Sequence, residues 1–319
     1  MVSMAVRTGP KFWGKSTCCS YLTISKWKQH MTDLDSSTIL SVVVPVLNEA
    51  AVIERTLARL VAQEALDEVI VVDNGSDDGT PGIVRDFAVA HPKVELVHEP
   101  VRGIAAARNA GFDKARGEFI ARTDADTLVA ADWGSTILEF LTAHPEVAAV
   151  TGLCTYHDSP IGFFLKFGQA VLLRSGKLGG QVGNMYGPNM ALHRDTWLRV
   201  REDTQVRADV AEDLDLALCL SKRGLRIDQL TSMRAQTSSR RRRTSPRRWW
   251  QFQLIGLRTI QDHGFVVRPV HRITIVGAWL AHTVQWPIYR FWDFRRQRFS
   301  FHPGAERISA VGDSQTKRG

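Results

Sequence analysis

Cysteine is scarce in this sequence of 319 residues, and its placement excludes two kinds of structure. The four cysteines are Cys18, Cys19, Cys154 and Cys219. No two of them have the spacing of zinc ligands, and four are too few for a disulfide framework in a chain this long. We therefore expect neither a zinc-stabilised nor a disulfide-stapled fold. Cysteine usage favours a reducing, cytosolic compartment.

Residues 1–30 lack both acidic groups and an apolar core long enough for a signal peptide. They differ in character from the rest of the sequence, and the first strong strand pattern follows only after Met31 and a polar run. We expect a disordered extension here, with the functional chain beginning near Met31. A targeting or membrane-contact role is the alternative.

Long hydrophobic runs are lacking as well. The stretch 273–289 carries no formal charge, but His282, Gln285 and Pro287 interrupt it, and a membrane span needs about 20 apolar residues. Tryptophans lie near its end and arginines flank it. These features are more typical of a helix that lies at a membrane interface than of one that crosses the membrane.

Acidic residues are rare after residue 235, where 16 basic groups stand against 4 acidic ones. Residues 31–235 are the reverse, with 20 basic and 29 acidic groups. An acidic body argues against a nucleic-acid partner. We divide the chain into the extension at 1–30, a main domain over 31–235, and a basic helical extension over 236–319.

Short β-branched runs alternate with segments of helical spacing from residue 39 onward. This alternation predicts an α/β fold, with a mainly parallel, Rossmann-like sheet flanked by helices. The expected strands are 39–45, 68–73, 94–98 and 118–123, and the expected helices are 51–63, 79–91, 104–114, 133–144 and 211–223. Sheets of this kind bind ligands beyond the carboxyl ends of their strands.

Polar clusters stand at three of those strand ends: Pro45–Glu49, Asp73–Thr80 and Asp124–Asp126. Any one of them is explained equally well as a turn and helix cap. Three on one edge of a sheet favour a binding site. Asp124 and Asp126 can meet one ion only if the chain turns between them, and carboxylates suit Mg²⁺ or Mn²⁺.

Five segments resemble, in order, those of the family-2 inverting glycosyltransferases, which have the nucleotide-diphosphosugar transferase (GT-A) fold. They are Val42–Glu49, Val71–Thr80, Gly103–Gly111, Asp124–Asp126 and Glu212-Asp213. Each segment is loosely defined alone, but the ordered set is specific. The resemblance covers residues 39–224 and implies an enzyme that uses a nucleotide-diphosphate sugar as donor.

The resemblance also implies roles for single residues. It places Asp73 against the nucleotide base, Arg108 near the sugar or phosphates, and Asn189 near the transferred sugar. Asp126 would hold a divalent metal ion, Mg²⁺ or Mn²⁺, directly, and Asp124 would contact the ribose or the metal. The nucleotide pocket would be lined by Pro45, Asn48 and Glu49, with close backbone approach at Gly75 and Ser76.

Glu212 and Asp213 open a predicted helix, where acidic residues also occur for helix-dipole reasons. The resemblance assigns Asp213 as the general base that takes the proton of the acceptor hydroxyl, with Glu212 as a partner. Processive synthases carry Gln-x-x-Arg-Trp after the acid pair. Because Arg247-Arg248-Trp249 matches that motif only in part, processive synthesis is not expected.

The arginine run 240–248 leaves three interpretations open. It could be a solvated loop, a contact for diphosphate or an anionic acceptor, or a contact for anionic lipid headgroups. With the 273–289 stretch, it predicts an enzyme held peripherally at the cytoplasmic face of the cell membrane. The acceptor is unknown, and a lipid-linked one is among the options. The alternative is a soluble enzyme whose helix packs on its own domain.

Two other functions remain as alternatives. A sugar nucleotidyltransferase would want a glycine-rich, lysine-bearing triphosphate loop, and Pro45–Glu49 has neither feature. A non-catalytic sugar-nucleotide or membrane-surface binding protein would lack the metal pair or the base. Asp124, Asp126 and Asp213 are all present, so the sequence favours metal-assisted glycosyl transfer with inversion.

Overall fold

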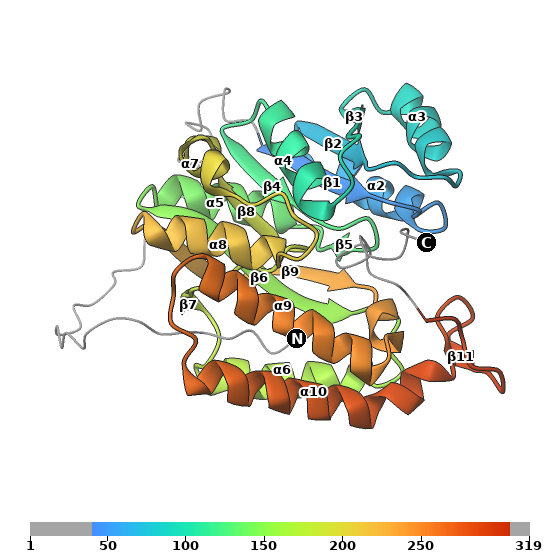
Figure 1. The fold of residues 1–319 in the computed structure, drawn as a ribbon. Coiled ribbons are helices and arrows are strands. Elements are labelled where there is room, and N and C mark those ends of the chain that lie inside the picture. The colour runs from blue at the N-terminus through green and yellow to red at the C-terminus, as the bar shows by residue number, and fades with distance from the viewer. Residues whose placement is uncertain (1–39, 307–319) are drawn as a thin grey trace.

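The computed structural model describes residues 40–306 of the chain. The extension expected at 1–30 lies outside this range. Within the main domain, the expected helices and strands agree with the observed ones to within two residues at each end. The α/β class predicted from the alternation is confirmed (Figure 1).

The strands, in chain order, are β1 (Leu40–Val46), β2 (Glu68–Asp73), β3 (Val94–His98), β4 (Phe119–Arg122), β5 (Leu128–Val129), β6 (Val147–Tyr156), β7 (Gly180–Gln181), β8 (Met190–His193), β9 (Arg226–Thr237), β10 (Trp292–Asp293) and β11 (Arg298–Phe299). The α-helices are α2 (Ile53–Val61), α3 (Thr80–Ala90), α4 (Ile104–Lys114), α5 (Trp133–Ala143), α6 (Gly162–Arg174), α7 (Arg194–Val200), α8 (Glu212–Lys222), α9 (Pro246–Asp262) and α10 (Pro269–Arg290). Two 3₁₀ turns, η1 (Arg201–Asp203) and η2 (Arg240–Arg243), complete the described elements.

The central sheet has nine strands, with the order β3-β2-β1-β4-β8-β6-β9-β5 and β7 paired to β9. Its first four strands are parallel, as the sequence predicts. Beyond β4 the sheet is mixed, because β8 runs antiparallel to both β4 and β6. The chain changes direction across the sheet between β1 and β4, so the loops after these two strands open into one crevice.

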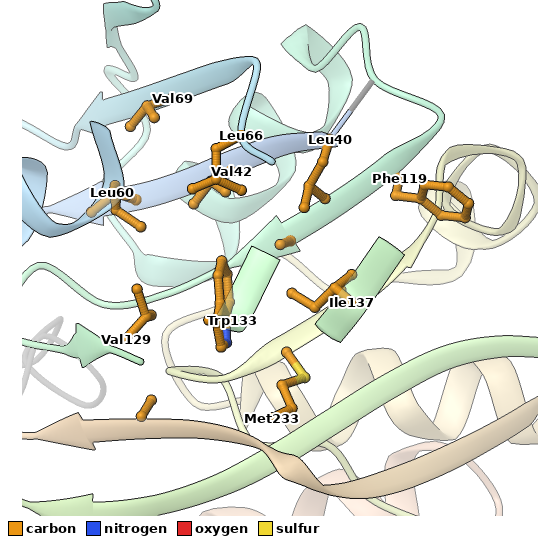
Figure 2. Close-up of a cluster of buried hydrophobic side chains, with 14 of the residues drawn as sticks. Leu40, Val42, Leu60, Leu66, Val69, Phe119, Val129, Trp133, Ile137 and Met233 are labelled. Atoms are coloured by element: carbon orange, nitrogen blue, oxygen red, sulfur yellow. The ribbon is translucent and has the colours of Figure 1, made fainter. Parts of the chain in front are cut away.

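Both faces of the parallel strands are buried, which explains their unbroken β-branched sequences. Val42 and Val44 of β1 point to one core, with helices α2, α3 and α5, whereas Val43 points to the other, with α4, α7 and α8. Figure 2 shows the first core, which contains β1 side chains together with Trp133 of α5 and Met233 of β9. The two cores fix the strand ends that carry the site.

Helices α6, α9 and α10 lie at one end of the molecule, opposite α3 (Figure 1). Trp249 of α9 stacks on His282 of α10 with ring centroids 4.2 Å apart. The His282 Nε2 atom lies 2.8 Å from the carbonyl oxygen of Thr244, at the end of η2. His263, which follows α9, lies 2.7 Å from Asp215 of α8, so the basic C-terminal region is packed onto the sheet domain. Strand β9 itself continues to Thr237, past the division expected at residue 235.

Two helical glycines give a matched test of this packing. A Cβ atom added to Gly111 of α4 would lie 2.2 Å from a methyl group of Val43, whereas one added to Gly82 of α3 would meet nothing within 4 Å. We expect Gly111→Ala to lower the free energy of unfolding by about 1–3 kcal/mol through overpacking. Gly82→Ala should raise it by up to about 1 kcal/mol, since alanine restricts the unfolded chain. Denaturant unfolding of both variants measures this, and equal effects would contradict the packing described.

Candidate functional site

The loops that follow β1 and β2 are bonded to each other at the edge of the sheet. The Asn48 side-chain amide donates to Asp77 Oδ1 at 2.7 Å, and the Asn48 backbone N–H donates to Ser76 Oγ at 3.0 Å. Glu49 N–H donates to Thr80 Oγ1 at 2.9 Å. Asn48 has a φ of 55°, a left-handed conformation that asparagine adopts more readily than most residues. The two loops form one wall of the crevice.

Asp73 ends β2 and is buried in this wall. Its Oδ1 accepts the Ser76 N–H at 3.2 Å, and its Oδ2 lies 3.5 Å from His98 Nδ1. Gly75 turns the chain here with a φ of 81°, in the left-handed region that favours glycine. Pro45 lies within β1, buried and paired with Val72 of β2, so its contribution is to the strand end rather than to the loop.

The segment Asp124–Asp126 makes the turn that a shared site requires. Thr127 N–H donates to the Asp124 carbonyl at 3.0 Å. The two carboxylates have different partners: Asp124 Oδ1 accepts from Arg122 Nη2 at 3.0 Å, and Asp126 Oδ2 accepts from Arg240 Nη2 at 2.8 Å. Asp124 is thereby directed towards the interior of the sheet and Asp126 towards the C-terminal region.

Glu49 Oε2 also lies 2.8 Å from Arg240 Nη2. The Glu49 and Asp126 oxygens thus converge on one cationic nitrogen, although they come from the ends of different strands. Carboxylate oxygens that already share one cation are the hard donor set that Mg²⁺ or Mn²⁺ takes. The residues present fit a divalent ion at this point.

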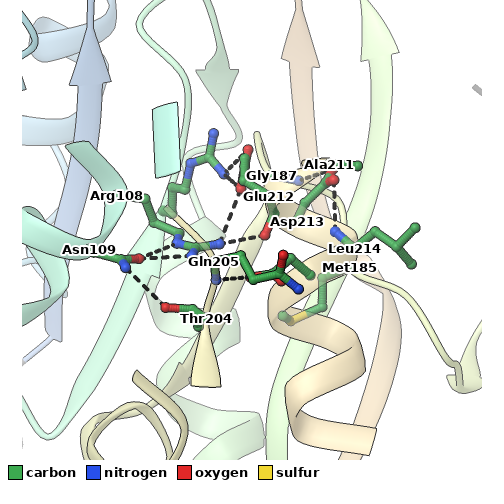
Figure 3. Close-up of polar contacts among 12 residues, drawn as sticks. Arg108, Asn109, Met185, Gly187, Thr204, Gln205, Ala211, Glu212, Asp213 and Leu214 are labelled. Carbon is green, nitrogen blue, oxygen red and sulfur yellow. Dashed lines mark hydrogen bonds and ion pairs between the residues drawn. The ribbon is translucent and has the colours of Figure 1, made fainter. Parts of the chain in front are cut away.

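The acid pair stands at the start of α8 (Figure 3), and the buried side chains of Arg108 and Arg122 lie against it. Arg122 Nη1 of β4 lies 2.7 Å and 2.8 Å from the two carboxylate oxygens of Glu212. Arg108 Nη1 of α4 lies 3.4 Å from the same carboxylate and donates to the Glu212 carbonyl. Glu212 is therefore held between two guanidinium groups, and its neighbour Asp213 is not.

The two acids consequently differ in acidity. Burial would raise the pKa of Glu212, but Arg122 and Arg108 together hold it below its ordinary value. Burial, and then the nearby Glu212 charge, raise the pKa of Asp213 to about 6. Environments that move the pKa values of two neighbouring acids in opposite directions leave one acid ionised and allow the other to exchange protons near neutral pH.

Gly187 brings the segment before β8 close to both groups. A Cβ atom at this position would lie 2.7 Å from Arg122 Nη1, so a side chain would displace the buried guanidinium. Gly187 N–H donates to Asp213 Oδ2 at 3.4 Å (Figure 3). The absence of a side chain therefore leaves room for the Arg122–Glu212 pair directly beneath Asp213.

Arg108 and Asn189 are both fully buried, and neither has a side chain at the open edge of the site. Arg108 donates hydrogen bonds to the Glu212 carbonyl oxygen and to Asn109 Oδ1. The Asn189 Oδ1 accepts from Trp133 Nε1 at 2.7 Å, while its Nδ2 donates to the Met233 carbonyl at 3.0 Å. Both side chains therefore lie in the interior, where they hold neighbouring groups of the site in place.

Three residues that the sequence analysis did not assign lie at the site: Arg122, Arg240 and His157. Arg122 precedes the Asp124–Asp126 turn, and its interior direction follows from the strand pairing. His157 Nε2 lies 3.2 Å from the Asp126 carbonyl oxygen. Arg240 was one of several equivalent arginines in the sequence, and only the fold distinguishes it from the rest.

Comparison with known proteins gives a family match over much of this region. Residues 41–195 match the sequence model of Glycosyl transferase family 2. The chain is 39% identical over 98 residues to glycosyltransferase AglE of Haloferax volcanii, covering 30% of this chain and 32% of that protein. It is 33% identical over 106 residues to the poly-beta-1,6-N-acetyl-D-glucosamine synthase of Staphylococcus epidermidis, covering 33% and 26%. The matches span about a third of the length of the first curated relatives.

Solved structures share the fold more widely. A mannosyltransferase of Pyrobaculum calidifontis, PcManGT, in complex with GDP-Man and Mn²⁺, is 25% identical, with a TM-score of 0.56 over 83% of this chain and 79% of that one. TarS of S. aureus, residues 1–349 in complex with UDP-GlcNAc, is 18% identical, with a TM-score of 0.51 over 82% and 81%. The second likeness concerns the fold alone.

Proposed function

Because this chain belongs to glycosyl transferase family 2 and has the GT-A fold, we propose that it transfers a sugar from a nucleotide-diphosphate donor to an acceptor hydroxyl, with inversion at the anomeric carbon. The observation that carries the proposal is the difference in ion pairing and pKa between Glu212 and Asp213. Glu212 is paired with Arg122 and Arg108, whereas Asp213 has a pKa of about 6. A carboxylate of that basicity can take a proton near neutral pH.

The donor site follows from the wall formed by the β1 and β2 loops. Asp73 would accept hydrogen bonds from the nucleotide base, as a carboxylate can accept N–H groups of uracil or guanine. Gly75 and Ser76 would allow close approach of the backbone. Asn48, and Pro45 behind it, would shape the pocket. PcManGT binds GDP-Man, which is consistent with a nucleotide-sugar donor here.

The acceptor side would be organised by Asp213. As the acceptor oxygen attacks the anomeric carbon from the face opposite the diphosphate, its proton passes to the Asp213 carboxylate, and the bond to the diphosphate breaks. Glu212 stays ionised and keeps Arg122 in place. We assign Arg108 and Asn189 positioning roles, through Glu212 and through Trp133 respectively.

Asp126 and Glu49 would hold a divalent metal ion, with Asp124 beside them on Arg122. A bound ion would neutralise the negative charge that builds on the departing diphosphate. Support comes from the convergence of the two carboxylates on one cationic nitrogen and from the Mn²⁺ bound by PcManGT.

The base assignment predicts a pH profile. Asp213 must be ionised to accept a proton, so kcat/KM should rise with pH through about 6 and then level off. Asp213→Asn should lose activity by about 10²–10⁴-fold, while donor binding persists. The variant should be at least as stable as the parent at pH 7, because it removes a desolvated charge.

Asp86→Asn, at an exposed site on α3, is the matched control and should leave both rate and stability unchanged. Release of free nucleoside diphosphate measures turnover, and pyrophosphate release would instead indicate a nucleotidyltransferase. Retention of the donor's anomeric configuration in the product, or an active Asp213→Asn enzyme, would contradict the assignment.

The metal assignment predicts dependence on a divalent ion. Chelation with EDTA should abolish transfer, and Mn²⁺ or Mg²⁺ should restore it. Asp126→Asn should lower the rate by about 10²-fold or more, since one of the few charged ligands is lost. Full activity of this variant in the presence of chelator would rule out the metal site.

We also propose that the enzyme lies on an anionic membrane face, as a peripheral protein at the cytoplasmic side. Among the helices that the structure describes, none combines the length and apolar character needed to cross a bilayer. α10 instead exposes apolar side chains, among them Ile273, Val276, Leu280 and Val284. This spacing places the four side chains on one face of the helix.

Helix α6 exposes further apolar side chains. Phe163, Phe164 and Phe167 are 77%, 71% and 63% exposed, and no residue of the helix is buried. The start of α6 is tied to the end of α10 by a 2.7 Å hydrogen bond between Ser159 and Tyr289. Both helices lie at the same end of the molecule (Figure 1).

Exposed basic residues accompany the apolar side chains, among them Lys166 in α6 and Arg272 in α10. Together they match the chemistry of a membrane interface, where apolar groups enter the acyl boundary and cations meet anionic headgroups. A surface of this kind would favour a lipid-linked acceptor. Peripheral contact of this type also matches the charge of the C-terminal region.

Cosedimentation with anionic vesicles tests this surface. The triple variant Phe163→Ser/Phe164→Ser/Phe167→Ser should bind about tenfold or more weakly, because each buried phenylalanine contributes up to about 1.5–3 kcal/mol. The loss should persist at high salt, where exposed charges are screened within about 8 Å. Val89→Ser on α3, where the side chain is 87% exposed, is the control and should bind normally. Equal binding of all three proteins would contradict the proposal.

A further inference from the structure

Arg240 occupies the point where the proposed metal ligands converge. Its Nη2 lies 2.8 Å from Asp126 Oδ2 and 2.8 Å from Glu49 Oε2. Its Nε donates to Ser238 Oγ at 3.1 Å. The side chain is 25% exposed, so the interaction is partly shielded from water. One guanidinium therefore serves as counter-ion to two carboxylates from different strands.

A divalent ion and this guanidinium compete for the Asp126 and Glu49 carboxylates. Both are cations that need those carboxylates at contact distance, and their mutual repulsion is strong in a partly buried site. We therefore expect a bound metal ion to displace Arg240 from these oxygens. The apparent affinity for metal is reduced by the fraction of molecules in which Arg240 holds the carboxylates.

Hydrogen bonds to Asp158 hold the backbone beside Arg240, so a change of partner would involve its side chain alone. Ser239 N–H and Ser239 Oγ donate to Asp158 Oδ1 at 2.7 Å and 2.9 Å. Ser238 Oγ donates to Asp158 Oδ2 at 2.5 Å. A released guanidinium must therefore find its next partner close to the same site.

The surroundings favour an anion as that partner. Arg240 borders a pocket that is also lined by Arg243 and Arg295, with Asp293 and Phe294 completing it. Three cationic groups against one carboxylate leave this pocket with net positive charge, which favours an added anion. A diphosphate brings such charge, and its oxygens match the two-pronged geometry of a guanidinium.

We propose that Arg240 is a donor-binding residue that first pairs with the metal ligands. It neutralises Glu49 and Asp126 until a divalent ion takes their oxygens, and it then binds the donor diphosphate. The proposal rests on the metal-assisted transfer proposed above. It predicts opposite effects of Arg240 on two binding steps. A residue with only a structural role would not produce that pair of effects.

The experiment measures Mn²⁺ binding to the full chain without nucleotide, by the electron paramagnetic resonance signal of free Mn²⁺. Arg240→Met should bind Mn²⁺ about tenfold or more tightly than the parent, since the competing cation is gone. Binding of inorganic pyrophosphate at saturating Mn²⁺, measured by calorimetry, should be about tenfold weaker in the same variant. For both ligands, the affinity of Arg240→Lys should lie between those of the parent and of Arg240→Met.

Arg258→Met is the matched control. Arg258 lies on α9, is 62% exposed and pairs with Asp209 at 3.5 Å rather than with the carboxylates of the site. It should shift neither binding step. Thermal melting gives a second readout: added Mn²⁺ should raise the melting temperature of Arg240→Met more than that of the parent, which also shows that the variant is folded.

Unchanged Mn²⁺ affinity in Arg240→Met would overturn the competition. Tighter Mn²⁺ binding with unchanged pyrophosphate binding would overturn the transfer to diphosphate. If no protein binds Mn²⁺, this inference fails together with the metal assignment, and the parent enzyme should then keep its activity in EDTA. If the parent loses activity in EDTA but Arg240→Met binds Mn²⁺ and pyrophosphate as the parent does, only the role of Arg240 is refuted.

Discussion

The buried Arg122–Glu212 ion pair is the interaction on which the arrangement of the site depends. It joins β4, in the parallel half of the sheet, to the first turn of α8 across 90 residues of sequence. Arg122 is 1% exposed, and its partners Glu212 and Asp124 take up its charge. A charge buried this deeply is tolerated only with good geometry on every side. The closeness of Gly187 to the guanidinium is part of that geometry.

This one pairing gives neighbouring acids different properties. Glu212 keeps its charge because it faces two guanidinium groups, and that retained charge helps to raise the pKa of Asp213. The basicity of Asp213 is thus a consequence of how α8 is docked. Arg122 also holds Asp124, so the same residue links the acid pair to the Asp124–Asp126 turn.

The crevice concentrates carboxylates, and the fold balances them with arginines from three regions. Arg108 and Arg122 come from the sheet domain and are buried, whereas Arg240 comes from the start of the C-terminal region and is partly exposed. The difference in exposure matches the proposed roles of Arg108 and Arg122 as fixed counter-ions and of Arg240 as an exchangeable one. Because Arg240 lies in η2, directly before α9 and α10, these helices are connected to the edge of the sheet where the donor would bind.

The sequence by itself determined the βα alternation, the position of the polar clusters at strand ends and the family resemblance, because these depend on local periodicity and short motifs. The tertiary structure decided what each polar side chain faces. The mixed half of the sheet, the interior placement of Arg108 and Asn189, and the exposed phenylalanines of α6 all result from contacts between distant segments. Arg240 shows the reason most clearly: in the sequence it is one of four consecutive arginines, and only the 191-residue and 114-residue separations closed by folding bring it to Glu49 and Asp126.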